Sequence, residues 1–532
     1  MHGWAALALL SAASMPLCAS LQWSNSAVTS RPLAFVAGSP FAPRARVPDA
    51  QQRRSTRALG LPSRPQRAQT PSSGIRSATS LLPSVLSTVT ATPQLMFQTL
   101  FVSLAATAAV AKVLDRDRGT QVEADEMPAD MRSLQIRFLV VFWLLRMADW
   151  LQGPYFYEVY ASKVIGGAPV ALDMVSKLFL IGFATTGILG PIVGKLVDSR
   201  GRRAGTLAFV ILYTIGALST RSDILAVLVL GRLAGGIGTS LLFSAPESWL
   251  VGEHTKGGFN GKWLGQTFGL AYAGDSLVAI AAGQLAGAAA AARGPCGPFE
   301  ISVAFLAAGG LYALWKWKEN VAPVSALSDE GPTIKEAWDV MLNDKKVLLV
   351  GAVQSLFEGA MYIFVLQWPP SLIAVVTGGA VPFGTVFSCF MASCLLGSTL
   401  FGALMKRGFE LEKTTAAMLG AATAAMATAT AMGSSLVAVV AAFLVFEVCV
   451  GMYFPSIGTL RSRYIPESHR SVIVNIFGIP LNLIVVAVFL SIKQLGVSGA
   501  LACSTLALAG ATLAQSILLM TANNSSKPLP GP

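Results

Sequence analysis

Charged side chains are scarce in this chain of 532 residues: Asp, Glu, Lys and Arg together make up 12% of it. A soluble domain carries about a quarter of such residues, so the shortage excludes an ordinary soluble protein. Hydrophobic residues instead reach 53%, and the mean hydropathy is +0.60. The composition predicts a protein that crosses a lipid bilayer many times.

Residues that hold metals or act as nucleophiles in clusters are also few. The three histidines are not grouped, and the six cysteines show neither metal-binding nor disulfide spacing. Four of these cysteines lie in apolar runs, where we interpret them as small packing residues. We expect no metal site, no cofactor and no enzyme, because a membrane-embedded enzyme needs a clustered nucleophile, metal or His/Asp set.

Acidic residues are nearly missing from the first 114 positions, which hold ten basic side chains and Asp49 as their single acid. Of the formal net charge of +12, this part therefore carries +9 and the rest of the chain +3. A charge concentrated in one N-terminal segment argues against a nucleic-acid-binding protein.

The N-terminal segment resembles a targeting sequence. Residues 1–20 place small residues after the short apolar run Trp4–Ala13, as in a secretory signal peptide. Residues 21–93 are rich in Ser, Pro, Ala and Arg and show no apolar periodicity, as in a transit peptide that does not fold. Together they resemble the bipartite leader of algae with complex plastids, which predicts a plastid envelope protein. An uncleaved disordered arm, with the plasma membrane or another endomembrane as the location, is the alternative.

Apolar runs of about the length that a bilayer needs fill the rest of the chain. Residues 94–114 predict an extra N-terminal span, and residues 136–317 predict six more. A polar linker at 318–345 precedes a further six in 346–520, and we expect the tail 521–532 to be disordered. The twelve core runs are 136–157, 172–195, 204–220, 224–250, 265–291, 298–317, 346–369, 382–404, 413–432, 435–457, 471–491 and 497–520.

Two patterns relate the two groups of six runs. Loops on one side hold seventeen Lys and Arg residues and loops on the other side hold five, so the first side faces the cytoplasm or its topological equivalent. Asp149 and Glu358 lie in the first run of each group, 209 positions apart. The segments that begin at Leu242 and Tyr453 end the fourth runs, 211 positions apart. The repeat predicts an all-α membrane protein of two six-helix halves, which is a transporter architecture.

The first core run carries charges where lipid would not tolerate them. Arg146 and Asp149 are three residues apart, so one helical face presents both. Charged groups at membrane depth normally face a protein interior or a water-filled path. Gly153-Pro154 then interrupts the helix, which is tolerated where the backbone lines a cavity. The pattern predicts that this run lines a transport pathway.

The loop between the second and third core runs reads Gly194-Lys-Leu-Val-Asp198-Ser-Arg200-Gly201-Arg202-Arg203. It resembles the signature loop of the major facilitator superfamily, with Ser199 in place of the usual first arginine. Asp198 can accept hydrogen bonds from a helix N-terminus or pair with Arg202. We expect a latch that holds one conformation of the two halves, with an ordinary basic turn as the alternative. The latch residues are Gly194, Asp198, Gly201, Arg202 and Arg203.

Five further segments resemble the molybdate-anion transporter family within this superfamily, over about residues 94–520. The resemblance implies the major facilitator fold, an early extra span and molybdate uptake, and it does not cover the leader. The segments are Ala148–Tyr155, Leu241–Trp249, Gln354–Glu358, Phe387–Ser398 and Gly451–Ser456 with Ile465–Glu467.

Molybdate is a tetrahedral dianion, which polar hydrogen-bond donors and helix N-termini bind. Arg232, on a glycine-rich run like the superfamily's second motif, is equally explained by a packing ion pair with an acid such as Asp149. Tyr155 is equally explained as an aromatic anchor at the membrane interface. The expected substrate-binding residues are Arg146, Asp149, Gln152, Tyr155, Arg232, Glu358 and Asn475.

Four acids lie within apolar runs. Moving a dianion against a negative-inside potential costs roughly 2.3 kcal/mol per charge per 100 mV, and protons carried on buried acids would offset this cost. We expect proton symport with Asp149 and Glu358 as the leading carriers; the alternative is that the acids only pair with arginine or cap helix breaks. The expected proton-coupling residues are Asp149, Asp275, Glu358 and Glu447.

The sequence therefore predicts a secondary active transporter of molybdate that works by alternating access, as a monomer in the lipid bilayer. Two alternatives stay open, because one fold hosts many substrates. The first is a carrier of another solute, such as a sugar, an amino acid or an organic anion. The second is a transporter-like substrate sensor.

Overall fold

The computed structural model describes most of the chain beyond its N-terminal segment. The predicted signal-like residues 1–20, and the predicted leader 21–93 except for its last two residues, lie outside the described part. The described ranges are 92–116, 127–322, 333–377 and 379–525.

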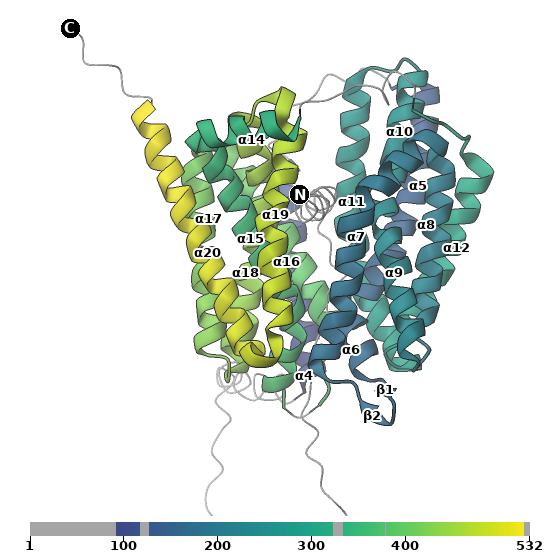
Figure 1. Ribbon diagram of the computed structural model, residues 1–532, viewed down its shortest axis with the longest axis vertical. Helices are drawn as coiled ribbons and strands as arrows, with labels where there is room; N and C mark the ends of the chain where they lie inside the picture. The colour runs from purple at the N-terminus through teal and green to yellow at the C-terminus, as the bar shows by residue number, and fades with distance from the viewer. Residues whose placement is uncertain (1–91, 117–126, 323–332, 378, 526–532) are drawn as a thin grey trace, which may run out of the picture.

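Long helices run side by side in two bundles, with α4 (Pro93–Arg116) beside the second (Figure 1). The first bundle contains α5 (Ala129–Gln152), η1 (Gly153–Tyr155), α6 (Phe156–Ala161), α7 (Leu172–Arg200), α8 (Arg202–Ser219), α9 (Leu225–Leu242), α10 (Ala245–Lys256), α11 (Gly261–Arg293) and α12 (Gly297–Lys316). The second contains α14 (Ile334–Asn343), α15 (Lys345–Val375), α16 (Phe383–Lys406), α17 (Leu411–Ala431), α18 (Leu436–Tyr464), η2 (Glu467–His469), α19 (Arg470–Leu490) and α20 (Ile492–Ser525). A two-residue hairpin, β1 (Val164–Ile165) with β2 (Ala168–Pro169), follows α6.

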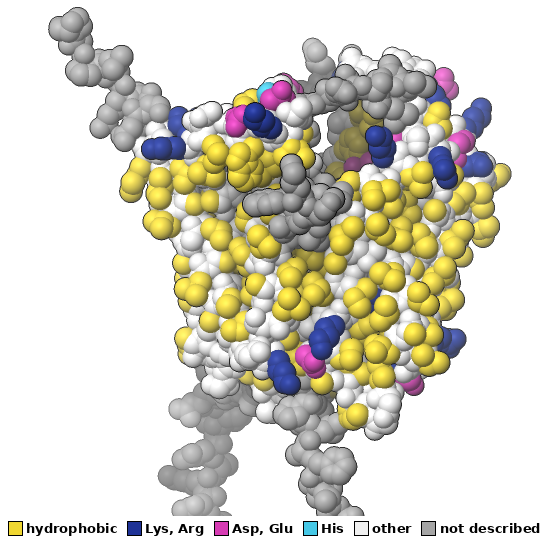
Figure 2. All heavy atoms as spheres, viewed as in Figure 1, with side chains coloured by type: hydrophobic (Ala, Val, Ile, Leu, Met, Phe, Trp, Pro, Cys, Tyr) yellow, Lys and Arg dark blue, Asp and Glu magenta, His cyan; other side chains and the backbone are white. Residues whose placement is uncertain are grey.

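Ten of the described helices are long and apolar enough to cross a membrane, judged by length and composition. Large hydrophobic side chains such as Leu311, Val437 and Leu506 remain exposed on the outside of the bundles. Figure 2 shows this apolar belt, with Lys and Arg gathered mainly near the ends of the helices. An outer surface of this kind suits lipid rather than water, and the prediction of an all-helical, multi-pass membrane protein is confirmed.

Local sequence sets where several helices begin and end. Thr333 and Glu336 form a reciprocal capping box at the start of α14, which satisfies backbone donors of its first turn. Gly201 has φ of 137° and separates α7 from α8, a backbone conformation that favours glycine. Gly153-Pro154 ends α5 in a short 3₁₀ turn, which redirects the chain into α6.

The two bundles meet where α11 crosses α16. Gly283 and Gly384 face each other there so closely that a side chain on either would collide with the other helix. The hydroxyl of Ser388 donates a hydrogen bond of 2.9 Å to the carbonyl oxygen of Ile280, in α11. Close approach of glycine-containing helices is typical of packing within membranes.

Aromatic rings form a second contact between the bundles. Phe179 of α7 lies edge-to-face against Phe489 of α19, with ring centroids 5.2 Å apart. Phe183, one turn further along α7, lies 5.5 Å from Tyr362 of α15. Such pairs are favourable, and they close the bundles against each other around the first half of α7.

The α16–α18 contact offers a test of the packing. A side chain on Gly397 would collide with the carbonyl oxygen of Val448, and one on Gly451 with that of Cys394. We expect Gly397→Val or Gly451→Val to destabilise the protein by about 1–3 kcal/mol, since backbone atoms cannot move aside cheaply. Thermal unfolding of purified protein measures the loss. The control is Gly402→Val on the same helix, where no atom lies within 4 Å of the added carbon; equal melting temperatures for all variants would contradict the packing.

Candidate functional site

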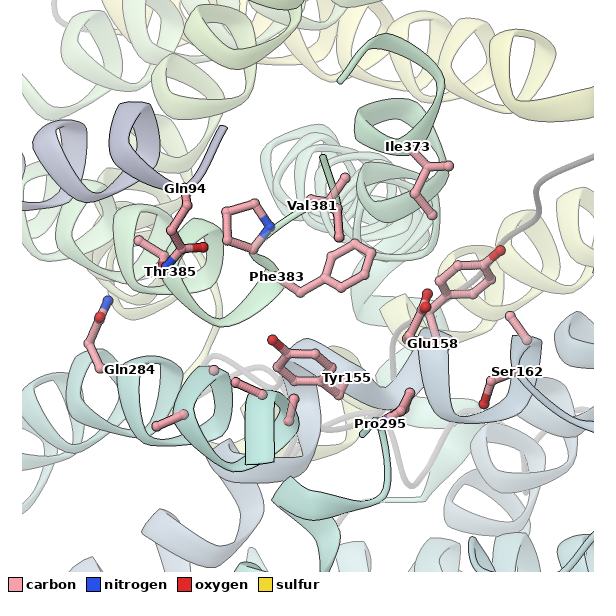
Figure 3. A pocket seen from close by; sticks show the side chains of 18 of the residues that line it. Gln94, Tyr155, Glu158, Ser162, Gln284, Pro295, Ile373, Val381, Phe383 and Thr385 are labelled. Carbon is pink, nitrogen blue, oxygen red and sulfur yellow. The ribbon is translucent and has the colours of Figure 1, made fainter. Parts of the chain in front are cut away.

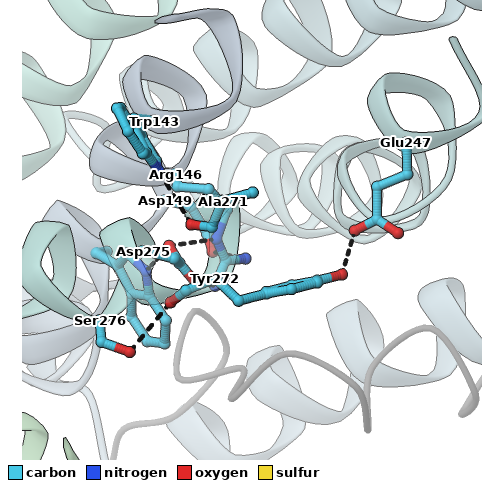
Figure 4. A network of polar contacts seen from close by, with 9 residues as sticks. Trp143, Arg146, Asp149, Glu247, Ala271, Tyr272, Asp275 and Ser276 are labelled. Atoms are coloured by element: carbon cyan, nitrogen blue, oxygen red, sulfur yellow. Dashed lines mark hydrogen bonds and ion pairs between the residues drawn. The ribbon is translucent and has the colours of Figure 1, made fainter. Parts of the chain in front are cut away.

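The most heavily charged buried cluster of the first bundle surrounds Arg146 of α5. The guanidinium is 1% exposed and donates from Nε and Nη2 to the two carboxylate oxygens of Asp275 in α11, each bond 2.8 Å long. Its Nη1 lies 3.5 Å from Asp149, one turn along α5. Figure 4 shows this pairing at the centre of a wider polar network. Arg146 is therefore fixed by a two-pronged ion pair of the strong kind.

Aromatic groups complete the surroundings of Arg146. Its guanidinium carbon lies 4.7 Å from the ring centre of Trp150 and 5.2 Å from that of Phe243. The indole of Trp150 also donates a hydrogen bond of 2.8 Å to Asp275. With both aspartates ionised the cluster has a formal charge of −1, so it does not attract a dianion.

Asp149 is fully buried and accepts a hydrogen bond from the hydroxyl of Tyr213 in α8. Beyond the cluster, Tyr272 of α11 donates a bond of 2.6 Å to Glu247 of α10 (Figure 4). The network thereby links α5, α8, α10 and α11 within the first bundle.

The second bundle has its own buried carboxylate, Glu358 of α15, which is 0% exposed. Tyr453 of α18 donates a hydrogen bond of 2.9 Å to its Oε1. Nη2 of Arg461, two turns further along α18, lies 3.3 Å from the same oxygen. The Nε of Arg461 donates a bond of 2.9 Å to the amide oxygen of Gln354. In both bundles the first long helix thus holds a carboxylate that a tyrosine and an arginine contact.

The other residues expected to bind substrate are spread through the molecule. Gln152 donates a hydrogen bond of 3.0 Å to Ser302 within the first bundle. The guanidinium carbon of Arg232 lies 4.3 Å from the ring centre of Phe156. Asn475, on α19, has a buried amide oxygen that accepts no hydrogen bond from the described residues. Arg146 and Asp149 are brought together, but the seven candidates do not surround one common position.

Tyr155 instead lines a pocket of about 840 Å³ between the two bundles, next to α4 (Figure 3). Its ring lies edge-to-face against Phe383, with centroids 5.8 Å apart. Glu158 and Gln284 also line the pocket, and its described lining contains no Lys, Arg or His. A cavity with a carboxylate and no cation does not suit a dianion.

Glu447 of α18 differs in its hydrogen bonding from the other three acids expected to couple protons. It is fully buried, and within the described residues neither carboxylate oxygen has a hydrogen-bond partner. An isolated buried carboxylate is costly unless it is neutral. Asp275, by contrast, accepts two hydrogen bonds from Arg146.

The signature loop forms a compact turn between α7 and α8. Asp198 pairs with Nε of Arg202 at 2.8 Å. The backbone amides of Arg203 and Ala204, at the start of α8, donate to the carboxylate of Glu319, which follows α12. Asp198 therefore pairs with arginine, while Glu319 supplies the acceptor for the helix N-terminus. These contacts all lie within the first bundle.

The latch that we expect at this loop predicts a transport defect without a folding defect. Asp198→Asn should slow transport severalfold, because its charge biases the balance between two global states that a transport cycle must visit. Membrane abundance should stay near normal, since a part-exposed ion pair contributes only about 0–1 kcal/mol. Initial uptake rates per folded molecule measure the effect, with Glu410→Gln in the α16–α17 loop as the control, because Glu410 pairs with Lys413 at 2.8 Å. Uptake rates in Asp198→Asn equal to those of the wild type would mean that the loop is only an ordinary basic turn.

Several residues of these networks were not among the predicted site residues, among them Tyr213, Tyr453 and Arg461. Tyr213 and Tyr453 are single tyrosines in apolar runs, which sequence cannot distinguish from interfacial anchors. Arg461 follows the predicted run 435–457 and reads as a loop residue, whereas α18 continues to Tyr464. The feature that could have identified the two tyrosines is that each half contains a buried acid, which needs a hydrogen-bond donor from the same half.

Comparisons with known proteins agree with this fold. A family model described as sugar transporters with 12 transmembrane segments matches residues 96–453. Molybdate-anion transporters from Xenopus tropicalis and Danio rerio are similar to the chain: the first is 32% identical over 366 residues, covering 66% of this chain and 77% of the relative. The second is 30% identical over 391 residues, covering 67% and 78%.

Among solved structures, a POT peptide transporter in complex with sulfate has a TM-score of 0.59 and 13% identity, covering 80% of this chain and 98% of that one. A POT family transporter in complex with 5-aminolevulinic acid also has a TM-score of 0.59 and 13% identity, covering 74% and 97%. At these identities the likeness concerns the fold.

Proposed function

Because the chain belongs to the molybdate-anion transporter family of the major facilitator superfamily, we propose that it carries molybdate across a membrane. The observation that carries the proposal is the identity of 32% to a molybdate-anion transporter across 77% of that relative. The buried contact of Glu358 in α15 with Arg461 in α18 agrees with an ionic rather than an apolar cargo.

The arrangement of the helices suggests how the protein would move its substrate. We assign six core spans to each bundle, α5, α7, α8, α9, α11 and α12 in one and α15–α20 in the other, with α4 as an extra span. Rocking of two such halves about a central site provides alternating access. In the other state of the cycle, the Phe179–Phe489 and Phe183–Tyr362 contacts would separate.

Proton coupling follows from the charge of the cargo. A dianion moving inward against a negative-inside potential costs roughly 2.3 kcal/mol for each charge per 100 mV. Asp149 and Glu358 are both fully buried, one in each bundle, and one proton on each would make the movement electroneutral. Glu447, buried without a hydrogen-bond partner in the described chain, is a further candidate.

Uptake by cells that lack molybdate transport tests the function. Cells that produce the protein should accumulate radioactive molybdate from nanomolar concentrations, and unlabelled tungstate or sulfate should compete more strongly than sugars. Since the matching family model is described as sugar transporters, inhibition by a sugar together with uptake of that sugar would favour a carrier of another solute.

The finer location is also a proposal. The apolar run Trp4–Ala13 and the acid-poor tract after it support delivery to a plastid envelope. Residues 1–93 fused to a fluorescent reporter should reach the plastid of a complex-plastid alga by the secretory route. A reporter that stays in the cytosol or at the cell surface would reject plastid targeting.

One chain holds both halves, so we propose that it works as a monomer.

A further inference from the structure

Arg146 and Arg461 each meet a buried carboxylate, but they are held very differently. Arg146 makes two bonds of 2.8 Å to Asp275 and is 1% exposed. Arg461 makes one contact of 3.3 Å to Glu358 and one bond of 2.9 Å to the neutral amide of Gln354. Its side chain is 15% exposed, and Nη1 donates to none of the described residues. Arg461 is therefore the arginine that can exchange its partner for a ligand.

We propose that Arg461 is an anion-binding residue of the transporter, and that protonation of Glu358 frees it to bind the oxyanion. The proposal rests on molybdate transport and deepens it by naming the residue that holds the substrate and the residue that senses the proton. The only covalent change is the O–H bond that forms when the carboxylate takes up a proton from water, and the guanidinium turns its donors from that carboxylate to the anion.

Charge explains why the two events belong together. With Glu358 ionised, the pair is neutral and its carboxylate repels a dianion. With Glu358 protonated, the pair carries +1, and the planar guanidinium offers paired donors of the geometry that oxyanions accept. Tyr453 keeps a hydrogen-bond partner in both states, because its hydroxyl also bonds a neutral carboxyl. Proton and anion therefore favour each other's binding, and this coupling is reciprocal.

Arg461 is a charged neighbour of Glu358 that comes from one of the described helices packed against α15. α15 packs against α14, α18, α19 and α20, and α18 supplies Arg461 and Tyr453. α19 has no ionisable side chain after Arg470, and α20 carries only Lys493 and Cys503. The charges of α14 precede Lys345 at the start of α15, several turns from Glu358. Where α7 meets α15, Phe183 contacts Tyr362.

Equilibrium binding of radioactive molybdate to the purified full chain tests the proposal at several pH values around neutral. Wild-type affinity should rise as pH falls, by up to about tenfold per pH unit if one proton binds with the anion. Glu358→Gln, a neutral mimic of the protonated acid, should bind tightly without this pH dependence. Arg461→Gln should bind about tenfold to a hundredfold more weakly at every pH, as expected for loss of a charge-assisted donor.

The matched control is Arg463→Gln, two residues along α18. Arg463 pairs with Glu412 at 2.8 Å and its side chain is 58% exposed, so its removal should leave molybdate binding unchanged. Wild-type affinity in Arg461→Gln, or a wild-type pH dependence in Glu358→Gln, would overturn the proposal. Because Glu358→Gln retains the shape of the site, it decides the question even if Arg461→Gln does not fold. Wild-type protein that neither binds nor transports molybdate would instead refute the proposed function itself.

Discussion

Asp275→Asn is expected to destabilise the folded protein by about 3–5 kcal/mol, which is the usual loss when one partner of a buried ion pair is removed. The change leaves the guanidinium of Arg146, 1% exposed, with only the 3.5 Å contact to Asp149 as an ion pair. Thermal unfolding of the purified protein, followed by tryptophan fluorescence, measures the loss. A melting temperature equal to that of the wild type would contradict the pairing.

The double variant Arg146→Met, Asp275→Asn is the control for this result. It removes both charges together, and the Asn oxygen still accepts the hydrogen bond of Trp150. Replacing a whole buried pair is often neutral, so most of the lost stability should return. Failure of the double variant to recover would mean that contacts outside this pair matter, such as that of Arg146 with Asp149.

Asp149→Asn is expected to lower the accumulation of molybdate rather than its binding. If two protons accompany each dianion, a pH gradient of one unit at zero potential supports about hundredfold accumulation, and one proton supports about tenfold. Binding should change little, because Arg146 stays paired with Asp275. Accumulation in proteoliposomes with the membrane potential clamped at zero measures the ratio.

Tyr213→Phe is the matched control, since it removes the hydrogen bond to Asp149 and leaves the carboxylate. It should keep the wild-type accumulation ratio, even if uptake is slower. Exchange of internal for external molybdate needs no net proton movement and should persist in Asp149→Asn. An unchanged accumulation ratio in Asp149→Asn would remove Asp149 from the proton path.

Hydropathy and glycine chemistry account for the parts of the fold that sequence could predict. Apolar runs marked the long helices because each must satisfy its backbone within lipid. Gly153-Pro154 marked the break after α5 because proline cannot continue the hydrogen-bonding of a helix. The apolar run 435–457 nevertheless stopped two turns before the end of α18 at Tyr464, since charged residues at the end of a helix look like a loop.

The pairings within the site were harder to predict. Arg146 and Asp149 share a helical face, and that relation is visible in the sequence. The main partner of Arg146 is Asp275, 129 positions away, and no periodicity links residues on different helices. For the same reason the sequence did not reveal the role of Glu319, whose carboxylate accepts a hydrogen bond from the N-terminus of α8, 115 positions away. Sequence identified which side chains were unusual for a membrane, and packing decided which of them meet.

Molybdate flux through purified, reconstituted wild-type protein tests the central claim most directly. Proteoliposomes with an inward proton gradient should concentrate radioactive molybdate from nanomolar solution, and collapse of the gradient should release it. Empty liposomes provide the background, and the same measurement with a labelled sugar provides the comparison. If liposomes that contain folded protein took up no more molybdate than empty liposomes, this result would contradict the account.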